Sequence, residues 1–155
     1  MSRRRRRTHP RQFQHFGYQA QGAPVIALDT NVLVRLVLRD DEAQALRARE
    51  LVETHAHSDA SLFVSDVVLA EFAWVLRSRY ALPGEAIAHT LRVMLDNATL
   101  AWQSRAAAVE ALRLFEQGSV DFPDCLVIAL AQSHNCEAVA TFDRGMRTLP
   151  NVRLL

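Results

Sequence analysis

The sequence has no run of eighteen apolar residues, only two cysteines, and only five glycines among 155 residues. The first absence excludes a membrane-spanning helix, and the apolar segment after the basic N-terminus, residues 25–28, is too short for a signal peptide. The few scattered glycines leave no glycine-rich phosphate loop, which argues against a phosphatase-like enzyme. We therefore expect a cytoplasmic protein without a membrane partner.

Metal-binding patterns built on sulfur or imidazole are also missing. Cys125 and Cys136 lack the paired spacing of a zinc site, and a domain of this size inside a cell needs no disulfide. We expect both cysteines to be small buried apolar groups. The histidines beyond the N-terminal tail show no ligand spacing: His55, His57, His89 and His134.

Charge divides the chain into two parts. Residues 1–20 contain six arginines and no acid, whereas the rest carries twelve arginines against seventeen acids, a net charge of −5. Residues 1–22 have little apolar content and are expected to be disordered, and residues 23–155 suffice for one domain around one core. The tail is either an arm that contacts nucleic-acid phosphates, or a segment outside the working protein that results from a start codon assigned too far upstream.

Strands and helices alternate along residues 23–155. Strands are predicted at residues 25–28, 62–64, 99–102 and 138–143, and helices at residues 31–38, 41–54, 67–80, 85–95, 104–117 and from 121 onward. In the helix at 67–80, the residues with helical spacing that should be buried are Leu69, Phe72, Ala73 and Leu76. The alternation predicts an α/β fold whose central parallel sheet is flanked by helices, with residues 25–28 as a buried central strand.

Four acids stand at the ends of these elements. Asp29 and Asp143 each end a strand, and Glu71 and Asp124 lie in early turns of helices. Because parallel strands end at one edge of a sheet, where open α/β sheets bind ligands, we expect these carboxylates to share a crevice. Each acid also has a purely structural alternative, such as a helix cap for Asp29 or Asp121, and a helix-dipole partner for Asp124.

The order of four short motifs resembles the PIN-domain family, and most closely its VapC-type toxin ribonucleases. The motifs are Leu-Asp-Thr-Asn-Val, Ala-Glu, Asp-Phe-x-Asp-x-Leu-x-x-Ala and Thr-Phe-Asp, within residues 28–143. The resemblance covers residues 25–155 and departs from the usual pattern at the tail and at Pro123 and Cys125. It implies a three-layer α/β/α PIN-like fold, magnesium-dependent RNA cleavage, usually a homodimer, and a small antitoxin partner in a type II toxin-antitoxin pair.

The resemblance also implies which residues form the active site. The catalytic, metal-binding acids would be Asp29, Glu71, Asp124 and Asp143, with Asp29 and Asp124 as direct ligands. The expected supporting residues are Asn31, Asp121 and Thr141. An all-oxygen cluster suits Mg²⁺ or Mn²⁺ rather than zinc, and a metal-activated water would attack the RNA phosphate.

Because the folded part is acidic, RNA must be attracted by local basic groups. Arg35, Arg39 and Arg144 lie beside the proposed site and are candidate RNA-binding residues, with solvated surface charge as the alternative. Two other functions stay open, namely a non-toxin PIN-domain nuclease in RNA processing and a non-catalytic PIN-like module that binds RNA or protein. The non-catalytic module predicts a damaged acidic set, and all four acids are present.

Deletion of residues 1–21 is expected to leave the melting temperature nearly unchanged, because this segment has little apolar surface to bury. If its arginines form an arm, RNA binding weakens and becomes less dependent on salt concentration. Thermal melts and salt titrations of the full and shortened chains measure both effects. A large drop in melting temperature would show that the tail packs on the domain.

Overall fold

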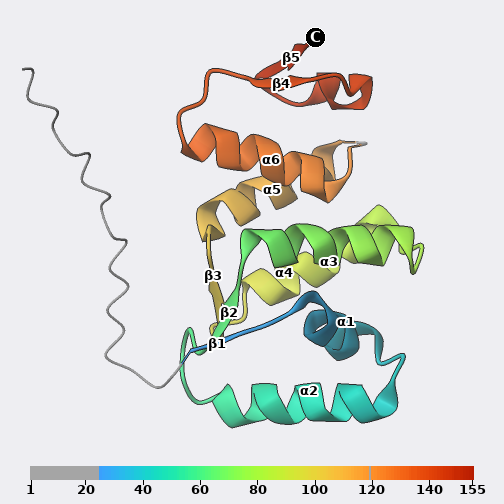
Figure 1. Cartoon of the computed structure of the whole chain (residues 1–155), viewed down its shortest axis with the longest axis vertical. Coiled ribbons are helices and arrows are strands. Elements are labelled where there is room, and N and C mark those ends of the chain that lie inside the picture. The colour runs from blue at the N-terminus through green and yellow to red at the C-terminus, as the bar shows by residue number, and fades with distance from the viewer. Residues whose placement is uncertain (1–24, 119) are drawn as a thin grey trace, which may run out of the picture.

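The computed structural model describes residues 25–118 and 120–155, so the prediction of a disordered tail at residues 1–22 lies outside the described residues. The described residues form an α/β fold in which a parallel three-stranded sheet is flanked by six α-helices (Figure 1). None of the helices described is both long enough and apolar enough to cross a membrane.

Every predicted strand and helix is present, with small shifts at the ends. The strands are β1 (Ile26–Ala27), β2 (Leu62–Val64), β3 (Leu100–Trp102), β4 (Val139–Thr141) and β5 (Val152–Leu154). The helices are α1 (Thr30–Leu38), α2 (Glu42–His55), α3 (Asp66–Ser78), α4 (Gly84–Leu95), α5 (Arg105–Gln117) and α6 (Phe122–Ser133). A short 3₁₀ helix, η1 (Arg144–Thr148), leads to β5. Neither η1 nor β5 was predicted, because each is too short to show a periodic pattern.

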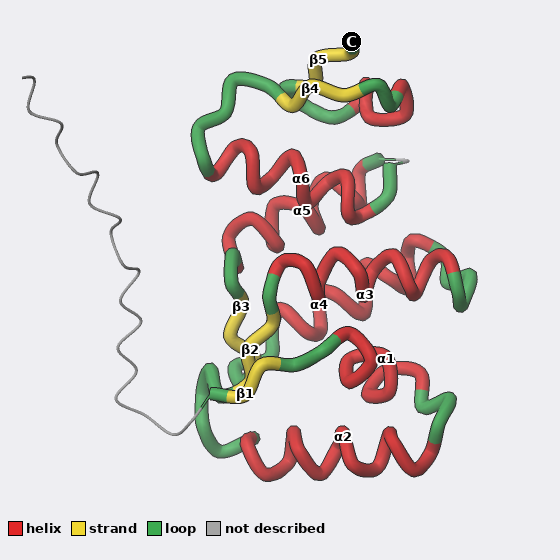
Figure 2. Tube along the Cα trace, in the orientation of Figure 1, coloured by secondary structure: helices red, strands yellow, loops and turns green. Residues whose placement is uncertain are grey.

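All strand pairs are parallel, as expected, but the strands belong to two sheets rather than one. The larger sheet has the order β1-β2-β3, with Ile26 opposite Leu62 and Leu62 opposite Leu100. β4 and β5 form the second sheet, with Val139 opposite Val152. Figures 1 and 2 show this second sheet beyond α5 and α6, at the end of the molecule away from α2. Alternating elements predict parallel pairing, but they do not specify the order of the strands.

The prediction of a buried central strand at residues 25–28 is wrong, because β1 is an edge strand and β2 is the central one. Leu28 is buried, but Val25 is 42% exposed and Ala27 is also exposed. A strand that pairs on one side only leaves part of its surface uncovered. Asp29 therefore follows an edge strand of the larger sheet, while Asp143 follows a strand of the other sheet.

Helix α3 contributes the central part of the hydrophobic core. The four residues predicted to be buried are all buried: Leu69, Phe72, Ala73 and Leu76. Helix α3 contacts α1, α4 and α6, and α5 packs along α6. Between α5 and α6, the rings of Phe115 and Phe122 meet edge to face with centroids 6.0 Å apart.

The two cysteines differ in their surroundings. Cys125 in α6 is fully buried, as predicted, whereas the prediction for Cys136 is wrong because that residue is exposed. Cys136 lies beyond the end of α6, in the connection to β4, where the chain turns at the surface. Burial, together with the nearby Asp124 and Asp121, raises the pKa of the Cys125 thiol to about 11.

Two apolar residues of α4 allow a matched test of this core. Leu91 is fully buried and Val93 is 57% exposed. We expect Leu91→Ala to lower the free energy of unfolding by about 2–5 kcal/mol, because it removes buried methyl groups and leaves a cavity. Val93→Ala should change it by less than about 0.5 kcal/mol. Urea denaturation of both variants measures the difference, and similar losses would show that α4 does not pack through Leu91.

Candidate functional site

Asp29 caps helix α1. Its Oδ2 atom accepts hydrogen bonds from the backbone N of Asn31 at 3.4 Å and from Asn31 Nδ2 at 3.3 Å. These bonds are long and therefore weak. The structural alternative for Asp29 is thus present, yet the residue is exposed and its Oδ1 atom accepts no hydrogen bond within the described residues.

Glu71 is linked to the neighbouring Thr30. The Thr30 hydroxyl, on a residue that is only 3% exposed, donates a 2.6 Å hydrogen bond to Glu71 Oε2. A bond to an ionised carboxylate is among the stronger side-chain interactions. It joins the first turn of α1 to α3 and sets Glu71 beside the residue that follows Asp29. Sequence reasoning did not include Thr30 in the site, although its position directly after the first acid was an available signal.

Asp124, in the first turn of α6, lies near two other acids. Partial burial raises the pKa of its carboxyl group, and the negative charges of Asp143 and Asp121 raise it further. Asp121 occupies the N-cap position of α6 but makes no side-chain capping bond. Instead its Oδ1 atom pairs with Nε of Arg77 from α3 at 3.2 Å. Of the structural alternative for Asp121, the N-cap position is therefore present but the side-chain cap is not, since the side chain forms an ion pair with α3 instead.

Asp143 is fixed by its own loop. Its backbone N donates to Thr141 Oγ1 at 3.0 Å, and the backbone N of Gly145 donates to Asp143 Oδ1 at 2.7 Å. A Cβ atom at position 145 would lie 3.0 Å from that oxygen. Because Gly145 has no Cβ atom, the Asp143 carboxylate can approach the start of η1. The Thr141 hydroxyl oxygen also holds the backbone of Asp143.

The candidate acids thus occur in two groups. Asp29 and Glu71 are associated through Thr30, and Asp124 is near Asp121 and Asp143. Across residues 25–118 and 120–155, no three histidine, cysteine, aspartate or glutamate side chains gather closely enough to hold a metal ion. The oxygen-only donor set suits Mg²⁺ in kind, but a complete group of ligands is not assembled. A crevice shared by all four acids remains a prediction.

The three candidate RNA-binding arginines differ in how strongly they are engaged. Arg35 donates to Gln44 Oε1 at 2.9 Å and pairs with Asp40 Oδ1 at 2.6 Å. The Tyr80 hydroxyl also donates to Asp40, and with Arg35 it lowers the pKa of that carboxyl group. Arg35 therefore links α1 to α2 and to the connection between these two helices.

Arg39 and Arg144, by contrast, are exposed. Neither arginine forms an ion pair with another residue of the described ranges. Their guanidinium groups therefore remain available for an external anion, which keeps both residues as RNA-binding candidates.

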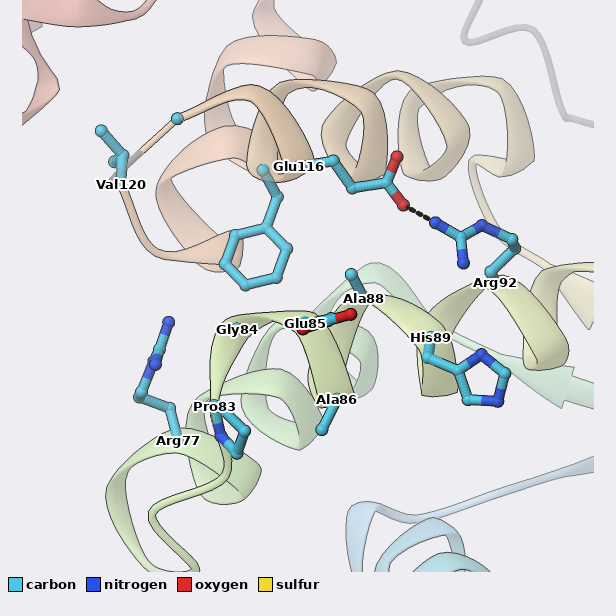
Figure 3. Close-up of a pocket in the computed structure, with 12 residues that line it drawn as sticks. Arg77, Pro83, Gly84, Glu85, Ala86, Ala88, His89, Arg92, Glu116 and Val120 are labelled. Atoms are coloured by element: carbon cyan, nitrogen blue, oxygen red, sulfur yellow. Dashed lines mark hydrogen bonds and ion pairs between the residues drawn. The ribbon is translucent and has the colours of Figure 1, made fainter.

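A cavity of about 810 Å³ lies between α4 and α5, apart from the candidate acids. Figure 3 shows Arg92 of α4 paired with Glu116 of α5 beside it, with His89 on the same helix. None of Asp29, Glu71, Asp124 and Asp143 lines this cavity. Arg77 is the link between the two regions, because it lines the cavity and also pairs with Asp121.

Comparison with known proteins identifies the family of this chain. The sequence model of the family described as "PIN domain" matches residues 26–152. No curated protein matches the chain. A solved structure titled "Toxin-antitoxin complex from Klebsiella pneumoniae" is 18% identical and covers 83% of this chain and 95% of that one, with a TM-score of 0.31. At that level of similarity, the assignment rests on the family match alone.

In chelator at neutral pH, Asp124→Asn is expected to raise the melting temperature. A raised pKa means that the folded chain binds this proton more tightly than the unfolded chain does. The parent therefore loses stability as pH rises from the ordinary carboxyl pKa through the raised pKa. The advantage of the variant should disappear below about pH 3, where the carboxyl is protonated in both states.

Thermal melts at several pH values measure this effect, and Asp59→Asn, at an exposed turn residue, is the matched control. A melting temperature that falls at every pH would contradict the expectation. It would show that Asp124 acts mainly on the helix dipole, an interaction of about 0.3–1 kcal/mol.

Proposed function

Because this chain belongs to the PIN domain family, a family of nucleases, we propose that it is a metal-dependent endoribonuclease and the toxin of a type II toxin-antitoxin pair. The observation that carries the proposal is the raised pKa of Asp124, part of which is caused by Asp143. These two acids come from separate motifs, and the effect of one on the pKa of the other supports the proposal that they share a site. Like charges held together are a common property of sites that bind cations.

The proposed cofactor is Mg²⁺, with Mn²⁺ as a substitute. When bound, it supplies Lewis acidity, which offsets charge on the RNA phosphate and makes hydroxide available near neutral pH. Asp29 and Asp124 would be direct ligands, with Glu71 and Asp143 completing the set. Because no three acids of the described residues lie close enough together to hold a metal ion, one ion can bind all four only if their carboxylates come closer together.

The neighbouring polar groups position these carboxylates. Thr30 holds one oxygen of Glu71, and the backbone N of Gly145 holds one oxygen of Asp143. Each of these acids keeps its second oxygen for a cation. Arg77 offsets the charge of Asp121, so that the negative charge near Asp124 is reduced without removing Asp124 itself. Supporting bonds of this kind hold ligands in the orientation that binding requires.

The toxin role and the partners rest on the order of the four sequence motifs. By that resemblance we propose a small antitoxin partner and a homodimer. The alternatives are a non-toxin PIN-domain nuclease in RNA processing and a non-catalytic PIN-like binding module. A small upstream reading frame that encodes an N-terminal DNA-binding pattern would favour the toxin, whereas a cleavage assay separates both nucleases from the binding module.

We expect the purified chain to cleave RNA in Mg²⁺ or Mn²⁺ and to lose this activity in chelator. Asp29→Asn and Asp124→Asn should each lower the cleavage rate by at least about 100-fold, because each removes a charged ligand. Gel analysis of a labelled RNA measures the rate, and Asp59→Asn should cut like the parent. Mg²⁺ should also raise the melting temperature of the parent more than that of either site variant. A site variant that cuts at the parent rate would show that its residue is not a ligand.

A further inference from the structure

Two aromatic side chains are exposed within residues 25–118 and 120–155, and both stand next to a candidate acid. Trp74 is 59% exposed and Phe142 is 80% exposed. Trp74 lies one helical turn after Glu71 in α3, and Phe142 directly precedes Asp143. Aromatic residues elsewhere in the core, such as Phe72 and Phe122, are fully or almost fully buried. Burial of the fold's own apolar surface therefore does not explain where these two rings lie.

Trp74 stands at the edge of a mostly apolar crevice that also contains the Arg77–Asp121 ion pair. It lines this small crevice with Arg77, Asp121 and Pro123, at the junction of α3 with the start of α6. The carboxylates of Glu71, one helical turn before Trp74, and of Asp121, which lines the same crevice, disfavour a phosphate directly over the ring. A neutral, flat group fits this position better, and an indole is the side chain that offers the largest face for stacking.

Phe142 lies in an exposed segment that also carries positive charge. Arg144 and Arg147 follow it within η1, and both are exposed. Neither arginine forms an ion pair with the residues described. Aromatic rings interleaved with unpaired basic groups are typical of surfaces that bind single-stranded nucleic acid, where rings stack on bases and arginines contact phosphates.

We propose that Trp74 and Phe142 stack on unpaired bases of the RNA substrate, Trp74 on the Glu71 side of the site and Phe142 on the Asp143 side. This inference rests on the proposed ribonuclease function and specifies how the substrate is held. Arg144 and Arg147 bind the phosphates next to the base on Phe142. Both aromatic residues therefore act in substrate binding rather than in the chemical step, so their loss affects KM more than kcat.

The test measures the affinity for short oligoribonucleotides of one length, with normal or abasic internal positions. Binding is measured in chelator with the parent, and in Mg²⁺ with Asp124→Asn to prevent cleavage. Trp74→Ala and Phe142→Ala should each weaken binding of the normal oligonucleotide by about 5- to 100-fold, whereas Trp74→Phe, which keeps an aromatic face, should weaken it much less. Val67→Ala, at a 75% exposed residue of the same helix, is the matched control and should bind like the parent.

Fluorescence adds a direct readout of stacking. The chain has two tryptophans, Trp74 and Trp102, so a Trp102→Phe background leaves Trp74 as the reporter. Its emission should be quenched by the normal oligonucleotide and much less by the abasic one. Equal affinity for the two oligonucleotides, or alanine variants that bind like the parent, would overturn the proposal. The proposal would also be overturned if Trp74→Ala abolished self-association, measured by sedimentation, but left the affinity for RNA unchanged. A second copy of the chain would then be what covers Trp74.

The outcomes separate this inference from the proposed function. If the chain cleaves RNA and both alanine variants keep the parent KM, the stacking proposal fails and the ribonuclease proposal stands. If base-dependent binding and quenching occur without cleavage, the ribonuclease proposal fails and stacking stands. A chain that binds no RNA under either condition overturns the stacking proposal.

Discussion

The burial of one face of α3 is the constraint on which the rest of the candidate site depends. Leu69, Phe72 and Leu76 are at most 1% exposed and are surrounded by other elements of the core. Because a helix has a fixed repeat, burial of these residues determines what the opposite face presents. That face carries Glu71 and Trp74, with Arg77 at its edge. The Thr30–Glu71 bond and the Arg77–Asp121 pair then attach α1 and the start of α6 to the same helix.

The charges around Asp124 work against the stability of this fold. Partial burial makes Asp124 costly to ionise, and the negative charges of Asp143 and Asp121 add to that cost. Arg77 forms an ion pair with Asp121 and offsets its charge. This pair lowers the repulsion on Asp124 without neutralising Asp124 itself. Residues that destabilise a fold in this way are retained in proteins mainly where an activity requires them.

Local patterns in the sequence predicted the α/β class, the positions of six helices and the buried face of α3, because each of these follows from the spacing of apolar residues. The order of the strands could not be predicted, since β1 and β4 are too short for their own residues to specify a neighbour. Side-chain partners that are distant in sequence were also missed, because local patterns do not specify them. The link of Thr30 to Glu71 and the ion pair of Asp121 with Arg77 each depend on the packing of α3 against another helix.

The contrast between the two cysteines has a practical consequence for labelling. Alkylating reagents react with the thiolate, and a buried thiol whose pKa is about 11 supplies almost none at neutral pH. Cys136 is exposed in the connection between α6 and β4. The natural sequence therefore provides a single reactive thiol, so a spectroscopic probe can be attached between the helix that carries Asp124 and the strand that precedes Asp143 without altering the core.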